Sequence, residues 1–166
     1  MDADLLDELY RKHYSSVLLY CTCLCGNEQL AQDLVADAFV KAYLSLPNDI
    51  PSFRYWLLRV CRNLWIDHLR KQKWEAGSEP LEYICSNDTL ESEHLRNEQH
   101  RILWKCILEL QPLDRELVTL HYFSGLGLQE AATMLGKSYE ATRQRMVRLR
   151  KTLKQRMEEQ GYGYEL

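Results

Sequence analysis

The chain has 166 residues and a net charge of −3, and 46% of its residues are hydrophobic. This length suits one domain or two small ones, and no apolar run approaches the roughly 18 residues of a membrane span. The N-terminus, MDADLLDELYRK, lacks the basic-then-apolar pattern of a secretion signal. We therefore expect a cytoplasmic protein.

The charges are unevenly distributed along the chain. Residues 51–74 carry a net charge of +5 and residues 137–157 carry +7, whereas residues 75–99 carry −6. Two basic blocks separated by an acidic one suggest two places that bind a polyanion. Each basic block falls on a distinctive predicted helix, so two merely solvated surfaces are the weaker explanation.

Two helices are predicted first, because apolar residues recur at steps of three and four. The first covers about residues 5–24 and ends at Gly26 and Asn27, which both tolerate a left-handed C-cap. The second covers about residues 28–46 and stops at Pro47. The apolar stripe expected to bury this second helix comprises Leu30, Leu34, Ala38, Val40 or Lys41, and Leu44.

The third predicted helix, residues 53–73, combines cations with aromatic rings. Such a combination suits the splayed bases of a single strand, which stack on rings while cations bind the backbone. For Trp56 and Trp65 taken singly a core role is favoured, because aromatic side chains supply much buried area. The cations are Arg54, Arg59, Arg62, Arg70, Lys71 and Lys73, and the aromatic residues are Phe53, Tyr55, Trp56 and Trp65.

Residues 74–94 lose the helical period and become acidic and rich in turn residues, which indicates a flexible linker between domains 1–73 and 95–166. The second domain is expected to start with a helix from about Leu95 and another over residues 113–123. No long stretch alternates as a strand would. The predicted fold class is therefore all-α, with two small helical domains.

A helix-turn-helix is predicted over residues 126–156. The motif needs a short helix, a tight turn with glycine and a second helix for the major groove. Ala131 and Ala132 are small where the two helices cross, Gly136 supplies the turn, and Ser138 can cap the second helix. The residues expected to face the core are Leu135, Thr142 and Met146.

The opposite face of this second helix is predicted to bind DNA. Arginine pairs with guanine edges or phosphates, and glutamine pairs with adenine. The N-terminal positions favour base contact, and the later cations favour phosphate contact. The first group is Tyr139, Glu140, Arg143 and Gln144, and the second is Arg148, Arg150 and Lys151, with Arg145 on the same face.

Six cysteines are present and are expected to be reduced thiols. The run Cys21, Cys23 and Cys25 invites comparison with a metal site, but zinc ligands usually have two or more residues between them. On a helix, Cys23 also points away from the face of the other two. Core packing is favoured, and a thiol or metal sensor is the alternative. No metal, cofactor or catalytic centre is predicted.

Three segments in order resemble the extracytoplasmic-function sigma factors of the bacterial sigma-70 family. They are AQDLVADAFVKAY (31–43), FRYWLLRVCRNLWIDHLRK (53–71) and LGLQEAATMLGKSYEATRQRMVRLRKTL (126–153). The first two are similar to family region 2 and the third to region 4. The resemblance covers nearly the whole chain, and three ordered motifs are far more specific than one helix-turn-helix.

The resemblance implies a promoter-specificity subunit without a small-molecule substrate, which binds core RNA polymerase at the β′ clamp helices and the β flap. The second helix would dock on the clamp helices, and its acidic and apolar face suits a basic protein partner. The family usually has Gln-Glu after DLV, where this chain has Ala36-Asp37. The implied polymerase-binding residues are Asp33, Leu34, Asp37, Phe39 and Lys41.

The resemblance also implies two promoter contacts. Asn63 and Asp67 match the family's RN…iD pattern over the −10 element, and the turn 47–52 with Phe53 matches the loop that captures a flipped base. The implied −10 set is Phe53, Arg54, Arg59, Arg62, Asn63, Asp67, Arg70 and Lys71. The implied −35 set is Lys137, Tyr139, Glu140, Arg143, Gln144, Arg145, Arg148, Arg150 and Lys151.

Regulation by an anti-sigma factor follows from the same resemblance. This partner is often a membrane protein, which would hold the chain at the inner face of the membrane. The alternative function is a helix-turn-helix regulator with a helical sensor or dimerisation domain. Such a regulator would bind a palindromic duplex as a dimer, whereas a sigma factor would bind polymerase first.

Overall fold

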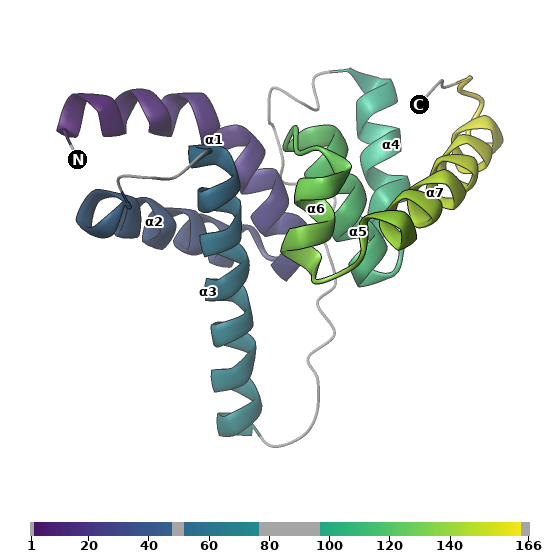
Figure 1. The fold of residues 1–166 in the computed structure, drawn as a ribbon. Coiled ribbons are helices and arrows are strands. Elements are labelled where there is room, and N and C mark those ends of the chain that lie inside the picture. The colour runs from purple at the N-terminus through teal and green to yellow at the C-terminus, as the bar shows by residue number, and fades with distance from the viewer. Residues whose placement is uncertain (1, 48–51, 77–96, 164–166) are drawn as a thin grey trace. The chain divides into compact units, whose positions relative to one another are not determined.

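The computed structural model describes residues 2–47, 52–76 and 97–163. Every regular element in these segments is a helix (Figure 1), and the chain divides into two units, Met1–Ser86 and Asn87–Leu166. The all-α class with two helical domains is therefore confirmed. Of the predicted linker, residues 74–76 complete a helix, and residues 77–94 lie outside the described segments.

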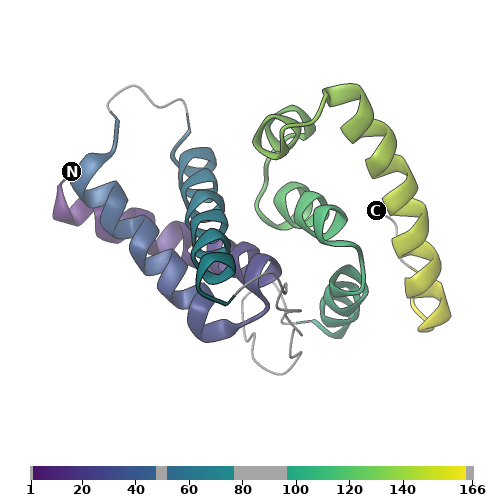
Figure 2. The same cartoon turned by 90° about the horizontal axis from the view of Figure 1, so that it is seen from below.

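The first unit consists of α1 (Ala3–Cys25), α2 (Glu28–Ser45) and α3 (Phe53–Ala76), and each packs against the other two (Figure 2). The chain leaves α1 through Gly26 in the left-handed conformation, with φ of 66°. The Gly26 N–H donates to the Thr22 carbonyl at 2.8 Å. Asn27 then caps α2, because its side chain accepts from the Leu30 N–H at 3.0 Å. The predicted boundary between these helices is confirmed.

Cysteines form part of the core of the first unit. Cys21, Cys25 and Cys61 are fully buried, and Cys23 nearly so, among side chains such as Tyr20. Burial raises the pKa of the Cys21 thiol, which keeps it protonated at neutral pH. The described residues contain no group of three His, Cys, Asp or Glu side chains that could bind a metal ion. The predicted packing role of these thiols is confirmed.

The apolar stripe predicted for α2 is wrong at its C-terminal end. Val40 is 56% exposed and Leu44 is 74% exposed. Helix α2 contacts both α1 and α3, so its buried face is centred on small residues that allow the helices to approach closely. Val40 and Leu44 lie outside this buried face. The buried residues of α2 are Ala31, Leu34, Val35, Ala38, Phe39 and Ala42.

The second unit consists of α4 (Glu98–Leu108), α5 (Pro112–Val118), a π-helical turn η2 (Thr119–Phe123), α6 (Leu128–Leu135) and α7 (Tyr139–Glu159). Helix α7 packs against α4, α5 and α6. The core of the second unit includes the side chains of Leu103, Ile107, Leu117, Leu120, Met146, Leu153 and Met157. Within the described segments, no helix is long and apolar enough to cross a bilayer.

We expect Leu58→Ala to lower the free energy of unfolding by about 2–5 kcal/mol, because Leu58 is fully buried and truncation leaves a cavity. Leu69→Ala is the matched control, since Leu69 lies on the same helix and is 39% exposed. Urea denaturation of the full chain, followed by helical circular dichroism, measures both. Equal losses from the two variants would contradict the core assignment.

Candidate nucleic-acid and protein interfaces

The helix-turn-helix is formed by α6 and α7. Gly136 ends α6 in the left-handed conformation, with φ of 68°, and the Lys137 N–H donates to the Ala132 carbonyl at 2.9 Å. Ser138 caps α7, because its Oγ accepts from the Ala141 N–H at 3.2 Å. Ala131 and Ala132 are fully buried. The motif is confirmed, and Leu135, Thr142 and Met146 face the core as predicted.

The exposed side of α7 begins with a hydrogen-bonded group of three side chains. The Arg143 guanidinium donates twice to the Glu140 carboxylate, at 3.2 and 2.7 Å, and the Gln144 amide donates to it at 3.3 Å. The Arg143 hydrogen bonds lower the pKa of the Glu140 carboxyl, which therefore stays ionised at neutral pH. Glu140 thus orients both candidate base-contacting side chains.

Two predicted DNA contacts are instead engaged within the second unit. The Arg145 guanidinium forms a hydrogen-bonded ion pair with Asp114 of α5. Arg150 donates to the Tyr122 hydroxyl at 2.6 Å, with its guanidinium carbon 6.0 Å from the ring centre. These two arginines are half-buried and border the buried face of α7, and their contact with DNA stays a prediction. The exposed members of the predicted set are Lys137, Tyr139, Glu140, Arg143, Gln144, Arg148 and Lys151.

A second basic surface lies along α3. Arg70 and Asp67 are both exposed and form a loose ion pair at 3.8 Å. Arg54 and Arg62 are half-buried. The predicted −10 residues that are exposed share one side of the helix at helical spacing: Arg59, Asn63, Asp67, Arg70 and Lys71.

Aromatic residues at the start of α3 join the three helices of the first unit. The Phe53 ring lies 5.5 Å from that of His13, 6.3 Å from that of Phe39 and 6.2 Å from that of Trp56. Trp65 is 7% exposed and stacks on His68, which confirms its predicted core role. Residues 48–51 of the predicted base-capturing turn lie outside the described segments.

The outer face of α2 combines acids with an apolar groove. Asp33, Asp37 and Lys41 are exposed, whereas Leu34 and Phe39 are buried and therefore position the helix. No charge pattern or motif in the sequence predicts the groove, because the apolar period places Val40 and Leu44 in the core.

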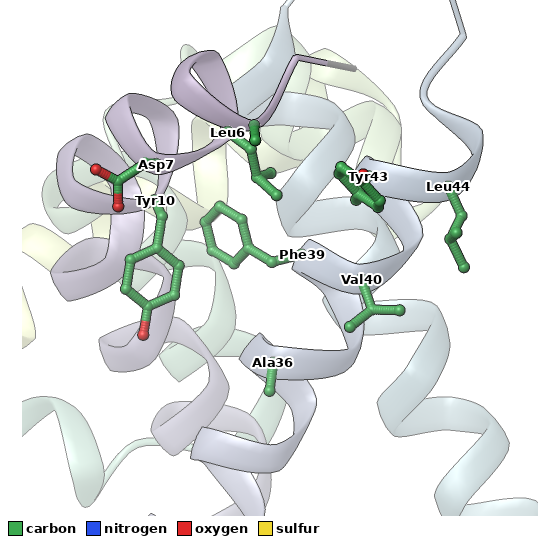
Figure 3. A pocket seen from close by; sticks show the side chains of 9 residues that line it. Leu6, Asp7, Tyr10, Ala36, Phe39, Val40, Tyr43 and Leu44 are labelled. Atoms are coloured by element: carbon green, nitrogen blue, oxygen red, sulfur yellow. The ribbon is translucent and has the colours of Figure 1, made fainter.

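The groove lies between α1 and α2 and has a volume of about 560 Å³. Figure 3 shows the side chains of Leu6 and Tyr10 from α1 facing that of Phe39 from α2. The Tyr10 and Phe39 rings meet edge to face, with their centres 4.9 Å apart. An exposed apolar surface next to carboxylates suits a protein partner rather than DNA. The other main apolar lining residues are Val40, Tyr43 and Leu44.

Comparison with known proteins identifies both units. The family Sigma-70 region 2 matches residues 9–75, and the family Sigma-70, region 4 matches residues 100–153. RNA polymerase sigma factor SigZ of Bacillus subtilis is 30% identical over 156 residues, which cover 92% of this chain and 87% of that protein. ECF RNA polymerase sigma factor SigM of the same organism is 28% identical over 151 residues, covering 90% of this chain and 93% of that protein.

A solved structure has the same fold. The sigma factor RpoE from Bartonella quintana, crystallised in complex with the anti-sigma factor NepR, matches with a TM-score of 0.70 at 20% sequence identity. The match covers 91% of this chain and 97% of that one.

Proposed function

This chain belongs to the extracytoplasmic-function group of the sigma-70 family of RNA polymerase sigma factors, and from that premise we propose how its surfaces divide the work of transcription initiation. The outer face of α2 docks on the β′ clamp helices of core RNA polymerase. The exposed side of α3 binds the −10 element, and the exposed side of α7 binds the −35 element. The second unit also contacts the β flap.

The observation that carries this proposal is the coexistence of two unlike faces. Helix α7 exposes cations and an oriented Arg143–Glu140–Gln144 group, which suits a duplex. Helix α2 exposes Asp33 and Asp37 beside an apolar groove, which DNA would repel. A promoter-specificity factor needs both a DNA face and a polymerase face, whereas a simple helix-turn-helix regulator needs only the first.

Within the −35 surface, Arg143 and Gln144 are assigned to base edges because they lie in the first turns of the recognition helix. Arg148 and Lys151 are assigned to phosphates. Arg145 and Arg150 contribute by bracing α7 against α5 and η2. Lys137, Tyr139 and Glu140 lie close to Arg143 and Gln144, at the N-terminal end of α7.

Within the −10 surface, Asn63 is assigned to an unpaired base, and Arg59, Arg70 and Lys71 to the backbone. Phe53, Arg54 and Arg62 are half-buried, so they support the surface as well as bordering it. Asp67 is assigned to orienting Arg70, with which it is paired at 3.8 Å.

An anti-sigma factor is the proposed regulator. The relative RpoE is bound to its anti-sigma factor NepR in the solved structure. By analogy, a partner helix would cover the acidic and apolar face of α2 in this chain and block polymerase. We place the protein in the cytoplasm, at the inner face of the membrane when that partner is membrane-anchored. No catalytic activity of its own is proposed.

The direct test is reconstitution of the full chain with core RNA polymerase, followed by run-off transcription of genomic fragments. We expect one copy of the chain per core enzyme and transcripts that start at defined promoters. A dimer that binds a palindromic duplex without polymerase would support the helix-turn-helix regulator instead.

The double substitution Asp33→Lys and Asp37→Lys should weaken core-polymerase binding about tenfold or more, because it places like charges against a basic partner. The affinity of labelled chain for core enzyme measures this effect. Glu8→Lys is the matched control, an exposed acid of α1 outside the groove lining. Normal affinity of the doubly substituted chain, with its helical content intact, would refute the docking assignment.

Arg143→Ala should change the −35 sequence preference, with a cost of about 1–3 kcal/mol on the preferred promoter. Lys151→Ala is the comparison, since loss of a phosphate contact should weaken all promoters equally and reduce the salt slope by about 1. Binding of holoenzyme to a library of −35 variants at several salt concentrations measures both. Uniform weakening by Arg143→Ala would assign that side chain to a phosphate.

A further inference from the structure

Helix α3 carries an aromatic residue with no structural role in the first unit. Trp74 is 91% exposed, the most exposed large apolar side chain in the described part of the chain. The other tryptophans differ, since Trp65 and Trp104 are buried and Trp56 is half-buried. An indole this exposed leaves its large aromatic face available to stack on a binding partner.

The place of Trp74 is defined by the length of α3. The apolar period predicts an end near residue 73, but the helix continues to Ala76. At 3.6 residues per turn, Trp74 therefore lies on the same side as Asn63, Asp67 and Arg70. The exposed residues on this side form the α3 stripe: Arg59, Asn63, Asp67, Arg70, Lys71 and Trp74.

We propose that Trp74 is a further promoter-contacting residue, whose indole stacks on an unpaired base of the −10 region. This inference rests on the proposed function of α3. It extends the −10 surface by one helical turn beyond Arg70 and Lys71 and adds an aromatic platform to a stripe of polar contacts.

The neighbours of Trp74 favour DNA over a protein as the occupant. Three of the exposed residues within one turn of it are cations, Arg70, Lys71 and Lys73, against one acid, Glu75. A lone ring among cations is the combination that binds single strands, because the ring stacks on a base while the cations bind the backbone. Leu69, the other large apolar residue exposed on the described part of α3, lies off the stripe.

The groove on α2 provides the contrast within the same unit. There Val40, Tyr43 and Leu44 are exposed together and adjoin carboxylates, so an apolar protein surface fits them. Trp74 has no such cluster of apolar neighbours within the α3 stripe. The groove and Trp74 therefore suit different partners.

The helix also sets where the stacked base lies. Trp74 follows Asn63 by eleven positions, which is about 16 Å along the helix axis. A strand in duplex DNA advances about 3.4 Å per nucleotide, and an unpaired strand can be more extended. The base on Trp74 therefore lies within about five nucleotides of the base that contacts Asn63.

The test uses holoenzyme, reconstituted from the full chain and core polymerase, on a promoter found by the run-off experiment. The fluorescent base 2-aminopurine replaces one non-template base of the −10 region at a time. We expect quenching at a position within about five nucleotides of the one that responds to Asn63→Ala. Trp74→Ala should abolish that quenching and reduce the opened fraction about fivefold or more, whereas Trp74→Phe should retain most of both.

Leu69→Ala is the matched control and should change neither signal. Unchanged fluorescence at every position in Trp74→Ala would overturn the inference while the sigma function stood, because the wild-type chain would still direct transcription. Weaker core-polymerase binding by Trp74→Ala would also overturn it and make Trp74 a protein contact. The inference would also be overturned if Trp74→Ala lowered the free energy of unfolding more than Leu69→Ala does, since the ring would then be packed in the free chain. Failure of the wild-type chain to activate polymerase would reject the proposed function and this inference together.

Discussion

The burial of one face of α2 against both α1 and α3 is the constraint on which the first unit depends. The alanines of α2 face the core, and the helical period therefore places Asp33, Asp37 and Val40 on the opposite, exposed side. Acids and apolar side chains are therefore presented together, and α1 completes the groove. The face proposed to dock on polymerase is thus the outer side of the helix that builds the core.

The same logic operates in α7, with a different outcome. Thr142, Met146 and Leu149 are buried, which sends Arg143 and Gln144 outward, where Glu140 orients them. The arginines that border the buried face have carboxylate or hydroxyl partners on the preceding helices. The cations of this basic helix are therefore divided between the exposed face proposed to bind DNA and contacts that brace α7 against the preceding helices.

Burial distinguishes the roles of two tryptophans that amino-acid composition alone cannot tell apart. Trp65 and Trp74 lie on the same helix beside cations, and either could stack on a base by its chemistry. Trp65 is enclosed by the three-helix core, whereas Trp74 lies in the last described turn of α3 and is exposed. An exposed ring that could stack on a base is thus present at a position that the sequence pattern predicts to lie in the linker.

The sequence by itself determined the local features of this protein. Gly26, Gly136 and the Ser138 cap act through neighbouring backbone, so helix ends and the helix-turn-helix could be predicted, as could the family from three ordered motifs. Only the tertiary structure decided which faces are free. The exposure of Val40 and Leu44 depends on where α1 and α3 pack, and the pairing of Arg145 joins residues 31 apart. Burial and long-range pairing depend on residues distant in the chain, which no local pattern records.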